Sequence, residues 1–162
     1  MDGSVLKKTI IRGVSTAKPD SSSIIYYALK YFDDEGNILK EDNCFNSDWW
    51  EDYGKLDELG CRKNFLDEYK LSKMLKASMK RMKPAEIAEI ECRDMDLFRY
   101  GLDYEELSTL WPKEKKFPPE SVKMEVRVYN FTEGKTCFNM TIDEKVLESR
   151  RKKVVAVNLL KE

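Results

Sequence analysis

The chain contains no histidine among its 162 residues. This absence excludes histidine-based catalytic triads, histidine-dependent metal sites and the most common general base near neutral pH. The 7 glycines stand singly and form no phosphate-binding loop. The 4 cysteines, Cys44, Cys61, Cys92 and Cys137, include no pair at Cys-x-x-Cys spacing and are expected to be free thiols. We therefore predict no metal ion and no cofactor.

Neither sign of charge dominates the sequence, and no apolar run is long. The 29 basic and 30 acidic residues give a net charge of −1, whereas nucleic-acid-binding domains usually carry a clustered basic face. No stretch approaches the roughly 20 apolar residues that span a bilayer, and the N-terminus lacks a signal-peptide layout. We expect no nucleic-acid or membrane partner, one monomeric domain, and a cytoplasmic location with the nucleus as an alternative.

Apolar patterning predicts about five strands. The clearest is ESVKMEVRVYNF, in which Val122, Met124, Val126 and Val128 alternate with polar side chains. Because proline cannot donate to a strand ladder, the double proline before this run must stand at the entrance of the strand. The candidate strands are residues 4–13, 23–32, 38–42, 85–92 and 120–131.

Two helices are predicted. The first covers 71–82, ends before Pro84 because the residue before a proline disfavours helical geometry, and carries its apolar side chains on one face. The second begins at Thr141, where Glu144 three residues later completes a capping-box pattern, and runs to the chain end. The shared face of the first helix comprises Leu71, Met74, Leu75, Ser78, Met79 and Met82.

Residues 43–66 show no sustained period. We interpret them as an excursion between core elements with a short helix. Trp49 and Trp50 in this segment either fold back on the domain or form a scaffold or oligomerisation surface, since exposed aromatic side chains need a partner.

The order of these elements resembles that of the FKBP family of peptidyl-prolyl cis-trans isomerases. VLKKTIIRGVSTAKP is similar to the first strand and loop of the family, and IIYYALKYFDDEGNIL to the second strand and its turn. LSKMLKASMKRMKPAEIAEIEC is similar to the helix and next strand, RYG to the aromatic–glycine step that opens the long loop, and FPPESVKMEVRVYNF to the double proline and last strand. GKTCFNMTIDEKVLESRRKK is similar to the linker from an FKBP domain to the tetratricopeptide (TPR) helices of large immunophilins.

This resemblance covers nearly the whole chain and implies an α+β fold. The expected architecture is an antiparallel half-barrel of about five strands wrapped around one amphipathic helix, followed by a C-terminal linker helix. Residues 1–132 would form the FKBP-like domain, with an insert at about 43–66. Residues 133–162 would lead toward a TPR module that is not part of this chain.

The resemblance also implies a pocket for an Xaa-Pro peptide. Active members have a phenylalanine–aspartate pair where this chain has Leu39 and Lys40, a tryptophan where it has Leu75, and an isoleucine where it has Ser72. These departures predict a degenerate pocket whose added cation could occlude or wet it. Carried over by position, the pocket comprises Tyr27, Leu39, Lys40, Leu75, Tyr100, Phe117 and Met124.

Two functions remain open at this point. The preferred one is a non-catalytic interaction domain of an immunophilin co-chaperone; the alternative is an active isomerase with a divergent pocket that binds Xaa-Pro peptides and macrolides. Rotation about the Xaa-Pro bond breaks no covalent bond, so the absence of histidine does not exclude activity.

The expected partners are client proteins and, through the downstream TPR module, a chaperone of the Hsp-ninety class. Clients would bind the long loop at 101–116, because loops on a rigid scaffold commonly carry binding residues. The alternative is that the apolar side chains of this loop merely hold it to the domain. The residues concerned are Tyr104, Leu107, Leu110 and Trp111.

Overall fold

The computed structural model describes residues 5–15, 17–47, 53–133 and 141–161. Within them, one antiparallel sheet has the strand order β1-β5-β6-β2-β3, and β4 also pairs with β2. The predicted α+β class is confirmed, with one strand more than expected. The strands are β1 (Val5–Ile11), β2 (Ile24–Phe32), β3 (Ile38–Glu41), β4 (Arg62–Phe65), β5 (Ile87–Cys92) and β6 (Val122–Phe131).

The β6 strand confirms its predicted alternation. Val122, Met124, Val126 and Val128 are at most 1 % exposed and belong to the main core. Tyr129 lies on the opposite face, as the alternation predicts, and its ring is buried there in a second, smaller core cluster. The register between β6 and β2 shifts at this residue, which is a β-bulge.

The α2 helix (Lys73–Met79) supplies the predicted apolar face but is shorter than the pattern indicated. Ser72 begins it, since its Oγ accepts a hydrogen bond from Leu75 N at 3.2 Å. After Lys80 the chain continues in a tighter turn, closed by a bond from Met82 N to Met79 O at 3.0 Å. The Met82 side chain nevertheless stays fully buried, so the core face extends beyond the helix itself.

The segment at 43–66 contains the expected short helix, α1 (Tyr53–Glu58), and also β4. Leu56 of α1 is buried against Phe45 and Tyr26 in the second core cluster. Trp49 and Trp50 lie outside the described residues, so the two interpretations of them stay open.

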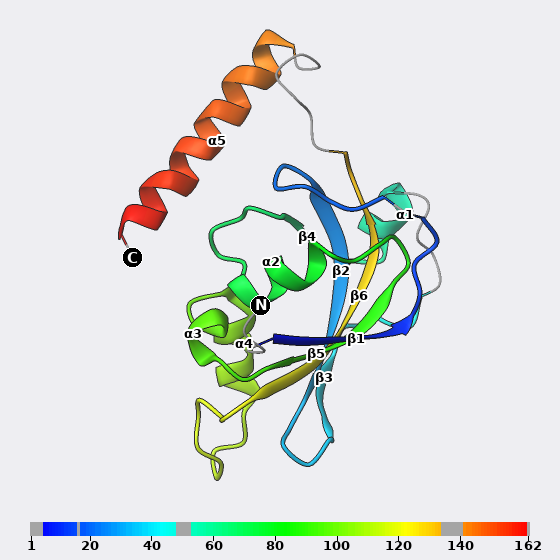
Figure 1. Ribbon diagram of the computed structural model, residues 1–162, viewed down its shortest axis with the longest axis vertical. Helices are drawn as coiled ribbons and strands as arrows, with labels where there is room; N and C mark the ends of the chain where they lie inside the picture. The colour runs from blue at the N-terminus through cyan, green and yellow to red at the C-terminus, as the bar shows by residue number, and fades with distance from the viewer. Residues whose placement is uncertain (1–4, 16, 48–52, 134–140, 162) are drawn as a thin grey trace.

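The long connection between β5 and β6 holds α3 (Met95–Phe98) and α4 (Leu102–Leu110). Together with α2 they lie on one side of the sheet and close the main core (Figure 1). The last helix, α5 (Ile142–Lys161), begins at the predicted cap, where Thr141 Oγ1 accepts from Glu144 N at 3.2 Å. It stands beside the domain (Figure 1), and no helix within the described residues is both long and apolar enough to cross a membrane.

Candidate functional site

Five of the residues assigned to the pocket meet around the main core. Leu75 and Met124 have no exposed surface, and Tyr27 is 2 % exposed. Leu39 and Phe117 are partly buried and pack against the same cluster. Tyr27 Oη donates to Asn64 Oδ1 on β4 at 2.8 Å, so β4 satisfies the one polar atom of this buried ring.

Tyr100 does not join this group. Its side chain is 75 % exposed, and its backbone has a φ of 63°, in the left-handed region that non-glycine residues seldom adopt. The ring lies beside the Arg99 guanidinium, 5.9 Å from its central carbon. The aromatic position before Gly101 therefore faces solvent.

Lys40 belongs to a charged network that fastens α4 to the sheet. Its Nζ donates to the carboxylate of Glu106 on α4. Arg62 Nη2 reaches the two oxygens of the same carboxylate at 2.7 and 2.8 Å, and Tyr31 Oη donates to it at 3.0 Å. Arg62 also holds Asp42 through Nε and Nη2, at 2.7 and 3.0 Å. This network (Tyr31, Lys40, Asp42, Arg62 and Glu106) links β2, β3, β4 and α4.

Electrostatics keep the Glu106 carboxylate and the Arg62 guanidinium ionised at neutral pH. Burial would raise the pKa of Glu106, but hydrogen bonds from Lys40 and Arg62 outweigh it and hold that pKa below its ordinary value. Burial would likewise lower the pKa of Arg62, but the hydrogen bond and charge of Asp42 raise it above the ordinary value. The network thus places charged side chains next to Leu39, one of the residues assigned to the pocket.

Asp103 is a second buried carboxylate, which the sequence analysis did not identify. It lies in the first turn of α4, is 1 % exposed, and its oxygens have no hydrogen-bond partner of good geometry among the described residues. Burial raises its pKa to about 6, although nearby Ser72 and the backbone N–H groups of Asp103 and Tyr104 act in the opposite direction. Its surroundings are tight: a Cβ at Gly101 would lie 2.5 Å from Asp103 Oδ1 and 2.9 Å from Ser72 N.

This carboxyl should make stability fall as pH rises. Because its pKa in the folded chain is raised from 3.8 to about 6, the stability it contributes is fully present below pH 3.8 and lost as pH rises through 6. The difference corresponds to about 3 kcal/mol. Asp103→Asn should therefore be more stable than the parent at pH 7, and this advantage should vanish near pH 4. Urea unfolding at each pH measures it; Glu105→Gln, exposed in the same turn, is the control. A pH-independent difference would contradict the assignment.

The side chains proposed to bind clients face inward. Leu107 has no exposed surface and Trp111 is 6 % exposed. Tyr104 and Leu110 are partly buried against the same core. The ring of Phe117 lies 5.3 Å from that of Tyr104 and 6.0 Å from that of Trp111. This packing favours the alternative interpretation, in which the apolar side chains hold α4 to the domain.

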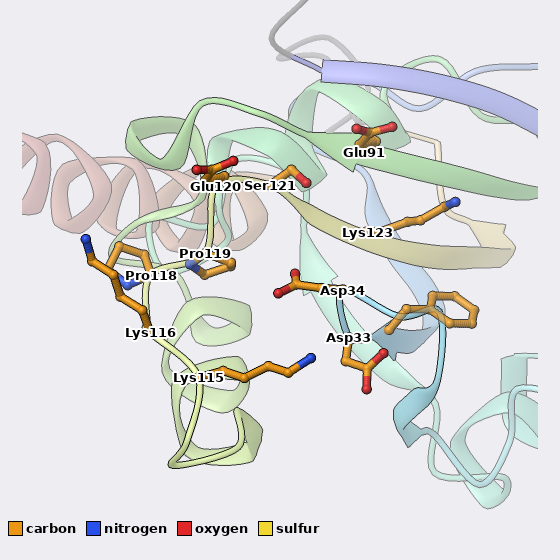
Figure 2. Close-up of a pocket in the computed structure, with 11 residues that line it drawn as sticks. Asp33, Asp34, Glu91, Lys115, Lys116, Pro118, Pro119, Glu120, Ser121 and Lys123 are labelled. Atoms are coloured by element: carbon orange, nitrogen blue, oxygen red, sulfur yellow. The ribbon is translucent and has the colours of Figure 1, made fainter.

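A cleft of about 740 Å³ lies beside the double proline, between the β2–β3 turn and the loop that enters β6. Figure 2 shows Lys115 reaching from this loop toward the turn, where its Nζ is 3.5 Å from Glu35 Oε1. None of the seven predicted pocket residues lines the cleft. Its lining is strongly charged and comprises Phe32, Asp33, Asp34, Glu91, Lys115, Lys116, Pro118, Pro119, Glu120, Ser121 and Lys123.

Comparison with solved structures identifies the fold of the chain. No family model and no curated protein matches the sequence, but solved structures match the chain. A match to the structure of the three FKBP domains of wheat FKBP73 has a TM-score of 0.53 at 13 % identity and covers 82 % of this chain and 46 % of that one. The N-terminal domain of FKBP42 from Arabidopsis thaliana aligns at 0.50 and 17 %, covering 82 % and 89 %. The fold is that of an FKBP domain.

A third FKBP-like match is FkpA from Escherichia coli, with a TM-score of 0.50, 14 % identity, and coverage of 81 % of this chain and 49 % of that one. The chain thus spans about half of the wheat and bacterial chains and most of the Arabidopsis domain. At such identities the likeness concerns the FKBP fold and leaves the chemistry of the pocket to be argued from this chain's own residues.

Proposed function

We propose that this FKBP-like domain is a protein-interaction module that does not catalyse prolyl isomerisation. The observation that carries the proposal is the bridge from Lys40 and Arg62 to Glu106, which fastens α4 beside the residues assigned to the pocket. An isomerase must favour the twisted, less polar amide of the transition state, and an apolar bowl open to the peptide does this. Here a charged network stands beside Leu39, and Leu75 and Met124 expose no surface to a peptide.

The alternative, an active isomerase with a divergent pocket, has one observation in its favour. Phe117 still groups with Tyr104 and Trp111, and Tyr104 also contacts Phe98, with ring centroids 5.8 Å apart. Such a cluster offers aromatic surface for a proline ring if α4 moves. Its substrates would be Xaa-Pro peptides, and macrolides would bind in the same place.

The proposed setting is an immunophilin-type co-chaperone in the cytoplasm, with client proteins as partners and an Hsp-ninety-class chaperone recruited through a TPR module. The support comes from α5, whose apolar side chains include Ile142, 80 % exposed, and Leu160, 88 % exposed. A helix with so much exposed apolar surface is suited to packing against further helices.

The proposal predicts no acceleration of isomerisation when the purified chain is added to fluorogenic Xaa-Pro peptides. Spontaneous isomerisation takes tens to hundreds of seconds, so even weak catalysis is readily detected. Circular dichroism must first show that the chain is folded, and an active FKBP domain serves as the positive control. Acceleration that is abolished by a macrolide would overturn the proposal and establish the divergent isomerase.

A further inference from the structure

A groove separates α5 from the body of the domain. It holds a hollow of about 600 Å³ between α2 and the last turns of α5. One point of attachment fixes the helix here: Arg151 donates to Asp67 Oδ2 at 3.1 Å and to Glu148 Oε2 at 3.1 Å, and its guanidinium lies 4.0 Å from the ring centre of Phe65. The hollow lies next to this attachment, at the end of α5 nearer the C-terminus.

The groove has apolar side chains on both sides. Leu66 and Ala77 line it from the domain, and Val155 and Leu159, one helical turn apart, line it from α5. Leu159 is 51 % exposed although it points into the groove, so the hollow is wide enough to leave apolar surface uncovered. Covering that surface would be favourable by the hydrophobic effect.

The side of the groove that α2 forms is strongly basic. Lys73, Lys80 and Arg81 line it, are exposed, and have no carboxylate within ion-pair distance in the part of the chain that the structure describes. Lys76 lies in the same wall. Asp67, the acidic side chain of the lining, is already bound by Arg151. The groove therefore combines an apolar interior with uncompensated positive charge, although the chain as a whole has a net charge of −1.

We propose that this groove binds an acidic amphipathic helix of another protein, which places its apolar side chains on Ala77, Val155 and Leu159 and its carboxylates against Lys73, Lys80 and Arg81. Helix-in-groove recognition needs this combination, and charge complementarity fixes the choice of partner. The lining residues include no aromatic side chain on which bases could stack, which disfavours single-stranded nucleic acid. The surface is concave, whereas membrane-bound helices present an outward apolar face. The inference rests on the proposed interaction role and names its surface and partner.

The test uses the full chain and a fluorescein-labelled helical peptide of about 18 residues, long enough to span roughly 27 Å. Leucines at i, i+3, i+4 and i+7 spacing form its apolar face, and glutamates occupy its other face. Fluorescence anisotropy should show saturable binding that weakens as salt rises, because screening reduces charge attraction. One control peptide carries lysine in place of every glutamate, and a second carries serine in place of every leucine. Neither should bind.

Charge reversal locates the site. Lys73→Glu/Lys80→Glu/Arg81→Glu should weaken binding at least about tenfold. Its matched control, Lys8→Glu/Lys18→Glu/Lys113→Glu, makes the same change in net charge at three exposed positions that do not line the groove and should leave binding unchanged.

A second matched pair tests the apolar contact. Leu159→Gln should weaken binding, whereas Leu160→Gln should not, since Leu160 is 88 % exposed and does not line the groove. These two neighbours share one helix, so a general effect on α5 would alter both variants alike.

Several outcomes would overturn the proposal: absence of peptide binding, binding that survives the groove reversal, or anionic phosphatidylserine vesicles or single-stranded RNA binding where the peptide does not. The isomerase assay on the same samples separates this inference from the proposed function. If the peptide does not bind and isomerisation is not accelerated, only the groove proposal fails. If isomerisation is accelerated, the proposed non-catalytic role fails.

Discussion

Arg62→Met is expected to lower the free energy of unfolding by about 3 kcal/mol, measured by urea unfolding at neutral pH. Breaking a buried ion pair by removing one partner typically costs 3–5 kcal/mol, because the remaining charge stays desolvated without compensation. The carboxylate of Asp42 would lose both of its bonds from Arg62 and keep the one from Leu29 N at 2.9 Å, whereas that of Glu106 would keep Lys40 and Tyr31. The Arg62 side chain is also 22 % exposed, so the expected loss lies at the lower end of the range.

The matched control is Arg93→Met. Arg93 forms an ion pair of similar length with Glu91, at 3.1 Å, but its side chain is 60 % exposed. Exposed pairs contribute at most about 1 kcal/mol, so this variant should remain close to the parent. Equal effects of the two substitutions would mean that the network around Arg62 is effectively solvated and does not hold α4 in place.

The elements that the sequence predicted correctly are those whose burial follows a simple period. β6 alternates cleanly because one of its faces meets α2 and the main core. The alternation continues to Tyr129, which lies on the opposite face and is buried in the second core cluster, although a bulge shifts the register there. The sequence predicts the core face of α2 equally well, since Met74, Leu75 and Met79 recur at helical spacing and are all buried.

The elements that the sequence did not predict lack such a period. β4 has the sequence RKNF and only four residues, and it exists because its backbone pairs with β2. α4 was predicted as part of an irregular loop, because acidic and apolar side chains mix in LDYEELSTL. Its core contact through Leu107 and its closely packed start at Gly101 are tertiary features.

The contacts of the candidate site were likewise predictable only in part. The resemblance assigned Tyr27, Leu75 and Met124 to one pocket, and the structure brings the three together in one core cluster, because their positions follow from the order of the elements. It could not pair Lys40 with Glu106, which is 66 residues distant in the chain. No local pattern indicates that contact, which joins Lys40 on β3 to Glu106 on α4.

Leu75→Ala is expected to lower the free energy of unfolding by about 2–5 kcal/mol, the range for truncating a leucine in a close-packed core. Leu75 has no exposed surface and packs in the same cluster as Tyr27 and Met124, so neighbouring side chains are expected to fill the new cavity only in part. Leu75→Met conserves the volume and should cost less than about 1.5 kcal/mol. Urea unfolding monitored by circular dichroism measures both variants.

This substitution also discriminates between the two functions. A leucine at the floor of an open pocket already faces water on one side, so its truncation removes fewer contacts and creates no closed cavity. Leu102→Ala, at a position that is 40 % exposed on α4, provides the reference for such a half-solvated leucine. If Leu75→Ala cost no more than Leu102→Ala, the pocket would be open in solution and the divergent isomerase would become the better proposal. A clearly larger cost would show that Leu75 is a core residue and that α4, held by Glu106, keeps the pocket closed.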